Sequence, residues 1–195
     1  MRTGIALIAL MLLVELAAAQ TQKAPPKTTP PPPAQPAKGV EVTLDGLKSI
    51  TPTNWKPEKP ANLLRPYQFR LPRADGDKED AVVFILNTVQ GTPEENLARW
   101  KDLFVLATNI PKDQASRQFG FKNSKAALTC LDIQGTYLVK HKPIDVAVQE
   151  SRPEYRMIAA LWVSKDNGYS IRLIGPKRTV ELYAKAFEQW LRGFK

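Results

Sequence analysis

Cys130 and His141 are the only thiol and the only imidazole in a chain of 195 residues, so they are the one nucleophile–base pair that it could offer. Cys130 falls in a segment with the pattern of a strand, where a cysteine is typically buried and unreactive. His141 falls in a segment with the pattern of a loop, between Lys140 and Lys142. Those two cations disfavour the imidazolium that a Ser-His-acid triad requires. We therefore predict that the protein is not an enzyme, and we assign no catalytic residue.

A short loop concentrates four carboxylates, and oxygen-rich loops of this kind can hold Ca²⁺. The four are Asp75, Asp77, Glu79 and Asp80. The helix–loop–helix calcium motif needs Gly at its sixth position and Glu at its twelfth, whereas here Gly76 is second and Leu86 is twelfth. Lys78 adds a positive charge to the same loop. We interpret the loop as the solvated tip of a hairpin and assign no metal or cofactor ligand. A metal-binding protein or metal-dependent enzyme using residues 75–80 remains the alternative.

The chain is basic, with 28 Lys+Arg against 19 Asp+Glu and a formal charge of +9. Its cations are spread along the sequence, without a block of five like charges and without a Gly-rich phosphate loop. A net positive charge attracts anionic surfaces at low salt. We expect an anionic envelope component or a protein as partner, and no nucleic acid. The single cysteine excludes an intramolecular disulfide framework and a Cys-rich zinc site.

The N-terminal segment has the pattern of a secretory signal peptide. Arg2 supplies a positive start, Ile5 to Val14 is an apolar run, and Ala17 and Ala19 fit a signal-peptidase site before Gln20. The run is shorter than the roughly 20 apolar residues that span a bilayer. The pattern predicts a signal peptide over residues 1–19, cleavage after Ala19, and a secreted or periplasmic protein with no transmembrane span after cleavage.

Residues 20–39 are rich in proline and lack large apolar side chains, so they cannot form a core. Their composition predicts a disordered linker with polyproline II character. Residues 40–195 follow as a single domain, long enough to bury a core.

Alternating or continuous apolar patterns in this domain predict several strands. The segments are 40–44, 67–71, 81–86, 118–122, 126–137, 155–163 and 169–173. Gly135 is expected to mark a bulge in the fifth of them. Residues 54–60 and 140–153 are expected to form loops, and Asn167-Gly168 has the composition of a hairpin turn.

Two helices are expected, one in the middle of the chain and one at its end. Thr92-Pro93-Glu94-Glu95 is a capping box, and Leu97, Trp100 and Phe104 continue it at helical spacing. An apolar stripe over residues 180–191 predicts the second helix. Hairpin connections between strands imply an antiparallel sheet. We predict an α+β fold with a sheet of about six or seven strands and helices packed on its faces.

Several short motifs along residues 49–191 resemble those of uncharacterised secreted bacterial proteins with a PsbP-like (DcrB/PsbP-type) domain. The matching stretches include Tyr67-Gln68-Phe69-Arg70-Leu71-Pro72, Gly76-Asp77-Lys78-Glu79-Asp80-Ala81, Asp132-Ile133-Gln134-Gly135-Thr136-Tyr137 and Arg152-Pro153-x-Tyr155-Arg156-Met157. Shorter matches are Trp55 with Pro57, Glu95-Asn96-Leu97 with Trp100, and Gly175-Pro176 with Thr179-Val180. The resemblance implies an α/β/α sandwich and transfers no catalytic residue, because a fold alone does not define a function.

Together these features predict a secreted, non-enzymatic binding or accessory module of the cell envelope, held away from a surface by its proline-rich spacer. The metal hypothesis for residues 75–80 and a hydrolase built around His141 remain as alternatives.

Overall fold

The computed structural model describes residues 38–87, 89–122, 126–139, 150–164 and 167–195. The predicted signal peptide and the linker up to residue 37 lie outside the described residues, and so does His141. All described residues belong to the unit Pro36–Lys195. No helix within these ranges is both long and apolar enough to cross a membrane.

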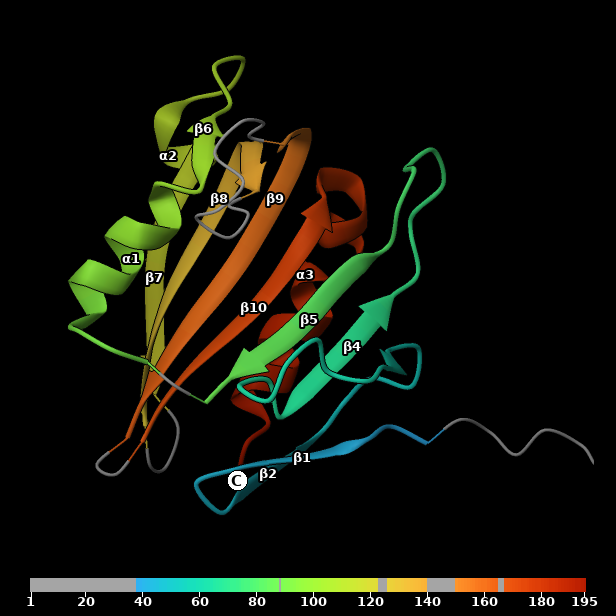
Figure 1. Ribbon diagram of the computed structural model, residues 1–195, viewed down its shortest axis with the longest axis vertical. Helices are drawn as coiled ribbons and strands as arrows, with labels where there is room; N and C mark the ends of the chain where they lie inside the picture. Colours follow the sequence, from blue (N-terminus) through green and yellow to red (C-terminus); the bar gives the residue numbers. More distant parts are fainter. Residues whose placement is uncertain (1–37, 88, 123–125, 140–149, 165–166) are drawn as a thin grey trace, which may run out of the picture. The chain divides into compact units, whose positions relative to one another are not determined.

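An antiparallel sheet forms the centre of this unit (Figure 1). Its order is β3-β4-β5-β10-β9-β8-β6, with β7 also pairing with β8, and each of these pairs is antiparallel. The strands are β3 (Lys56–Pro57), β4 (Tyr67–Leu71), β5 (Ala81–Leu86), β6 (Phe104–Leu106), β7 (Ser116–Lys122), β8 (Ala127–Val139), β9 (Glu150–Val163) and β10 (Gly168–Pro176). The predicted α+β class is confirmed, although the sheet has eight strands instead of six or seven.

A separate hairpin, β1 (Glu41–Leu44) and β2 (Leu47–Ile50), precedes the main sheet. Only one strand was expected here. Asp45 and Gly46 join the two strands with φ of 51° and 74°. Positive φ at both central residues is the geometry that Asp-Gly favours in a two-residue hairpin turn. The Asp45-Gly46 turn therefore reverses the chain and allows β2 to pair with β1. The alternating pattern of residues 40–44 predicts only β1.

The central helix α1 (Pro93–Lys101) begins with the predicted capping box. The Glu95 amide donates to Thr92 Oγ1 at 3.2 Å, and the Thr92 amide donates to Glu95 Oε2 at 2.9 Å. The expected extension to Phe104 is wrong, since the helix ends at Lys101 and Phe104 pairs with Tyr137 as the first residue of β6. Phe104 still packs with Leu97 and Trp100. A further one-turn helix, α2 (Lys112–Ala115), was not predicted.

The last helix, α3 (Lys177–Arg192), buries the predicted stripe of Val180, Tyr183, Phe187, Trp190 and Leu191. It covers one face of the sheet, and α1 lies over part of the other (Figure 1). Alternate residues of the central strands serve the two faces, because side chains alternate along a strand. The two helices therefore lie on opposite faces of the sheet, in agreement with the prediction of helices packed on its faces.

Two further expectations concern the long strands. The bulge expected at Gly135 is confirmed, since the register of β8 against β9 shifts between Gly135 and Tyr137. The loop expected over 140–153 is wrong at its end, because Glu150 to Pro153 already belong to β9. Residues 140–149 lie outside the described residues.

Candidate functional site

The acidic loop before β5 uses three of its carboxylates for contacts inside the protein. Asp77 Oδ2 accepts hydrogen bonds from the amide (2.8 Å) and hydroxyl (2.5 Å) of Thr179, in the first turn of α3. Asp80 pairs with Arg70 at 2.8 Å, and Glu79 pairs with Arg152 at 3.1 Å. No group of three or more His, Cys, Asp or Glu side chains in the described ranges is placed to hold a metal ion. These three carboxylates thus connect the loop to α3, β4 and β9. They do not converge on a common point where a metal ion could bind.

Cys130 lies fully buried in β8. Burial raises the pKa of its thiol to about 12. A thiol with such a pKa is almost entirely protonated at neutral pH, and the thiolate is the reactive form. This environment does not activate Cys130 as a nucleophile.

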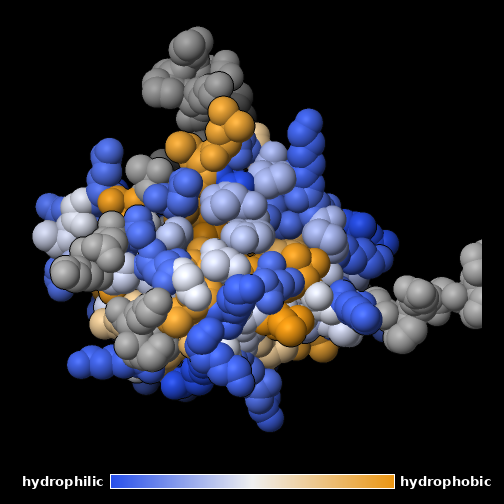
Figure 2. All heavy atoms as spheres, turned by 90° about the horizontal axis from the view of Figure 1, so that it is seen from below, coloured by the Kyte–Doolittle hydropathy of each residue, from blue (hydrophilic) through white to orange (hydrophobic). Residues whose placement is uncertain are grey.

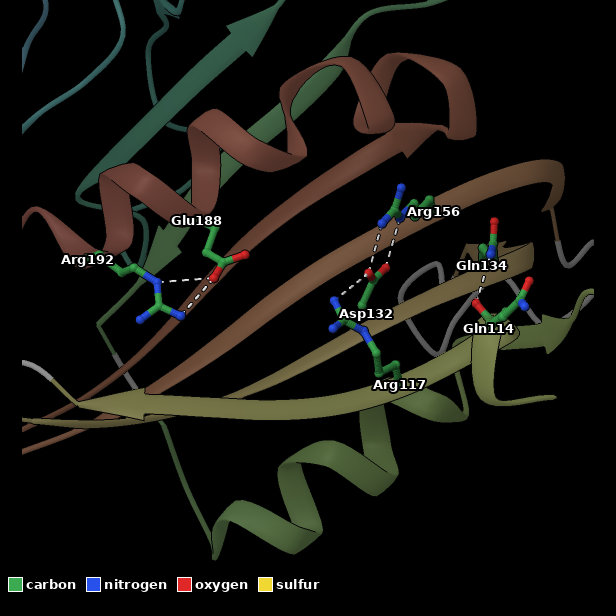
Figure 3. A network of polar contacts seen from close by, with 7 residues as sticks. All are labelled: Gln114, Arg117, Asp132, Gln134, Arg156, Glu188 and Arg192. Atoms are coloured by element: carbon green, nitrogen blue, oxygen red, sulfur yellow. Dashed lines mark hydrogen bonds and ion pairs between the residues drawn. The ribbon is translucent and has the colours of Figure 1, made fainter. Parts of the chain in front are cut away.

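Arginines on the α3 side of the sheet are paired with carboxylates (Figure 3). Arg156 forms two hydrogen bonds of 2.8 Å with the Asp132 carboxylate, and Arg117 approaches the same carboxylate at 3.7 Å. Arg192 binds Glu188 one turn earlier in α3. The bidentate Arg156–Asp132 pair bridges β9 and β8. Bidentate pairs of this kind are geometrically specific and leave little capacity for a ligand.

The α1 side of the sheet differs, because three of its arginines form no ion pair with any described residue. Arg172 comes from β10, Arg99 from α1, and Arg65 from the segment before β4. The titratable groups that act on Arg172 are Arg65, Arg99 and the phenol of Tyr137. Arg172 therefore lies within reach of two other cations, and none of the described groups that act on it is a carboxylate.

Arg172 is held in place by neutral groups. Its Nε donates to Ser170 Oγ at 2.9 Å. Its guanidinium carbon lies 5.0 Å from the Trp100 ring centroid and 5.7 Å from that of Phe84. Desolvation, followed by the positive charges of Arg65 and Arg99, lowers the pKa of Arg172 to about 10. Arg172 is still protonated at neutral pH, so the site carries a desolvated cation.

Arg65 lies beside Arg172 on the same aromatic ring. Its guanidinium carbon is 4.1 Å from the Phe84 centroid, and its Nη1 donates to Gln68 Oε1 at 3.2 Å. Its Nε is buried without a hydrogen-bond partner. Burial lowers the pKa of Arg65. A buried donor that lacks an acceptor is unfavourable, and an additional acceptor would relieve it.

Arg99 marks the outer edge of the site. Its Nη2 donates to the carbonyl oxygen of Gln90 and, at 2.9 Å, to Asn96 Oδ1. Asn96 is buried and donates to the Gln90 and Thr92 carbonyls, so the capped first turn of α1 fixes the position of Arg99. The guanidinium itself stays exposed.

Arg99 and Arg172 line a hollow of about 440 Å³, which we call the arginine hollow. Arg65 lines a neighbouring cavity of about 420 Å³ together with Glu79 and Asp80. The arginine hollow is lined by Leu64, Gln90, Asn96, Arg99, Trp100, Leu103 and Arg172. None of these seven residues carries a thiol, hydroxyl, imidazole or carboxylate, and arginine does not give up its proton in proteins. The lining can bind and orient an anion through guanidinium and amide donors, and it contains no group suited to acid–base or nucleophilic chemistry.

A further cavity of about 410 Å³ lies between the acidic loop and the start of β9. Arg152 contributes to it but is already bound to Glu150 at 2.7 Å, to Glu79, and to the Tyr155 hydroxyl at 3.2 Å. Its positive charge is therefore balanced, unlike that of Arg172.

The cations are spread along the sequence, so their spacing does not indicate the hollow around Arg172. One signal was available: Arg172 stands in the middle of an apolar strand that was expected inside the sheet. A cation at such a position is rarely buried without a partner.

Neither a protein-family model nor a curated relative matches the sequence. The structure is similar to the solution structure of cyanobacterial PsbP (CyanoP) from Synechocystis sp. PCC 6803. The two share 12% sequence identity with a TM-score of 0.47, over 86% of this chain and 97% of the other. The neighbour is of the PsbP kind that the sequence motifs resemble, and the likeness concerns the fold.

Proposed function

We propose that this protein is a secreted or periplasmic, non-enzymatic binding module whose arginine hollow takes up an anionic group of an envelope component. The location rests on the signal-peptide pattern of residues 1–19 and the proline-rich segment 20–39. The single observation that supports binding of an anion is Arg172, a desolvated guanidinium with no carboxylate partner among the described residues.

The energetic reason is the cost of an uncompensated charge. Removing a cation from water is unfavourable unless an opposite charge or several hydrogen bonds replace the lost hydration. Trp100 and Phe84 compensate Arg172 in part, since a cation over an aromatic ring gains about 0.5–2 kcal/mol. An anion in the hollow would add charge-assisted hydrogen bonds worth about 1.5–3 kcal/mol each. A bound anion would thus stabilise the folded arrangement of these residues.

The test is thermal unfolding of the mature chain in phosphate and in chloride at equal ionic strength. We expect phosphate to raise the midpoint, because a ligand at about 100 times its dissociation constant stabilises the native state by about 2.7 kcal/mol. Arg172→Gln should remove most of this response. Arg178→Gln removes the same charge from an exposed position on α3 and should leave the response intact. An equal response in both variants would show that phosphate acts through net charge alone and would contradict the proposal.

A further inference from the structure

Two leucines stand fully or largely in solvent immediately before Arg65. Leu63 is 99% exposed and Leu64 is 54% exposed. Other large hydrophobic residues that reach the surface are Ile50, Val105, Leu106, Val163 and Leu182. On the face shown in Figure 2, hydrophobic residues emerge in separate groups between hydrophilic side chains. Single exposed leucines are common and need no explanation. A consecutive pair next to arginines without ion pairs indicates a surface that binds a partner.

The turn that carries these leucines is held in a defined conformation. The Leu64 amide donates to Asn62 Oδ1 at 3.0 Å, and the Arg65 amide donates to the Asn62 carbonyl at 3.2 Å. The Leu64 carbonyl accepts a hydrogen bond of 3.2 Å from the Asn87 amide, just after β5. Leu63 is therefore exposed on a turn whose main chain is held by hydrogen bonds.

Leu64 and two of the cations belong to one surface, and Leu63 directly precedes Leu64 in the chain. Leu64 lines the arginine hollow together with Arg99 and Arg172, and Arg65 follows it directly in the chain. Trp100 and Leu103 add apolar surface to the same lining. The hollow thus offers positive charge for an anionic head and apolar side chains for the body attached to it. A small inorganic anion would use only the first of these features.

We propose that the Leu63–Leu64 turn and the arginine hollow together form a docking surface for anionic phospholipid. The lipid phosphate occupies the hollow beside Arg172 and Arg99, while Leu63 and Leu64 enter the boundary between head groups and acyl chains. Shallow insertion of apolar side chains combined with attraction of basic residues to anionic head groups is the usual basis of peripheral membrane binding. This inference rests on the proposed function and specifies the source of its anion.

The experiment is co-sedimentation of the mature chain with vesicles of phosphatidylcholine alone and of phosphatidylcholine with phosphatidylglycerol. We expect binding to the vesicles that contain phosphatidylglycerol and little binding to the others. Leu63→Ala combined with Leu64→Ala should lower the vesicle affinity by about tenfold or more, because two inserting side chains lose most of their apolar area. Arg172→Gln should lower it as well.

Two controls separate docking from a general effect. Leu182→Ala removes an exposed leucine (62%) from α3, on the opposite face of the sheet, and should leave vesicle binding unchanged. Thermal unfolding in phosphate should still respond in a Leu63→Ala variant, because Leu63 does not line the hollow and Arg99 and Arg172 remain. Vesicle binding that is insensitive to the leucines would reveal simple electrostatic adsorption and overturn the inference.

The two proposals fail in different ways. If phosphate stabilises the chain through Arg172 but no vesicle is bound, the hollow serves a soluble anion or the acidic group of a protein. The proposed function then stands and the lipid inference falls. If neither phosphate nor phosphatidylglycerol has an effect that depends on Arg172, both fall.

Discussion

At the scale of single residues, the thiol of Cys130 shows how burial sets reactivity. Its side chain has no exposed surface, and its pKa is raised to about 12. We expect iodoacetamide to leave the native protein unmodified at about pH 8 and to label one site per chain after denaturation, as measured by mass spectrometry. If the native protein were labelled as fast as the unfolded chain, the thiol would be accessible and Cys130 would again be a candidate nucleophile.

The same shift gives a dependence of stability on pH. The folded state holds the Cys130 proton more tightly than the unfolded chain, whose thiol ionises near its ordinary pKa of 9.0. Between about pH 9 and 12 the native state therefore binds more protons, and its free energy of unfolding falls as pH rises. Below this window the thiol contributes no pH dependence. Comparison of Cys130→Ala with the unmodified chain by chemical denaturation would isolate the contribution.

Residue patterns predicted the neighbourhood of Cys130 correctly, and they failed for Arg172, for a physical reason. Alternation along β8 is a local property, so the sequence places Cys130 on a buried face without knowledge of its partners. Whether an arginine is paired depends on residues far away in the chain. Arg172 meets Arg65, Phe84 and Trp100, which come from three other segments. Only the folded sheet brings these segments together.

At the scale of elements, Asp77 acts as a remote cap for α3. The residue before that helix is Pro176, which provides no side-chain acceptor for the first amides. Asp77 from the acidic loop accepts the Thr179 amide and hydroxyl instead. We expect Asp77→Ala to lower the free energy of unfolding by about 1–2 kcal/mol, the usual cost of losing a capping side chain.

Asp75 gives the matched control for this prediction. It is an exposed carboxylate in the same loop, and Asp75→Ala should change stability by less than about 0.5 kcal/mol. Urea denaturation measures both variants. Equal losses would contradict a specific capping role.

Added Ca²⁺ offers a direct test of the metal hypothesis for residues 75–80, since a bound ion would raise the melting temperature of the native chain.

Some boundaries of helices and strands are set by neighbouring residues, and others are set by residues far away in the chain. The capping box fixes the start of α1 because all its groups lie within four residues. The end of α1 depends on a distant strand: Phe104 has helical spacing, but pairing with Tyr137 draws it into β6. The same holds for β3, a two-residue strand that exists only because Lys56 and Pro57 lie against Arg70 and Phe69. Where the decisive partner is far along the chain, periodicity alone gives the wrong boundary.

At the scale of the whole described unit, the arginines of the two faces of the sheet differ in their partners. On the α3 side, Asp132 and Glu188 balance Arg156, Arg117 and Arg192, as Figure 3 shows. On the α1 side, Arg65, Arg99 and Arg172 form no ion pair with the described residues. The α3-side arginines are thus used within the structure, whereas Arg99 and Arg172 beside Leu64 form no ion pair with the described residues. The proposed functions belong to the α1 side for this reason.

On the α3 side of the sheet, the core includes the last residues of the chain, where α3 meets the hairpin of β1 and β2. Phe194 is 2% exposed, with its ring centroid 5.1 Å from that of Trp162 and 5.2 Å from that of Trp190. Lys195 then exchanges two backbone hydrogen bonds with Lys48 of β2. The aromatic cluster thus joins the sheet, the helix and the hairpin in a single core.

We expect Phe194→Ala to lower the free energy of unfolding by about 3–5 kcal/mol, because it leaves a cavity among large aromatic side chains. Since the core is shared, the loss should appear in one cooperative transition seen alike by tryptophan fluorescence and circular dichroism during urea denaturation. Leu182→Ala, on the exposed side of the same helix, should cost less than about 0.5 kcal/mol. Two separate transitions in the Phe194 variant, the first confined to the hairpin, would mean that the hairpin is an appendage. The sheet and α3 would then be stable without it.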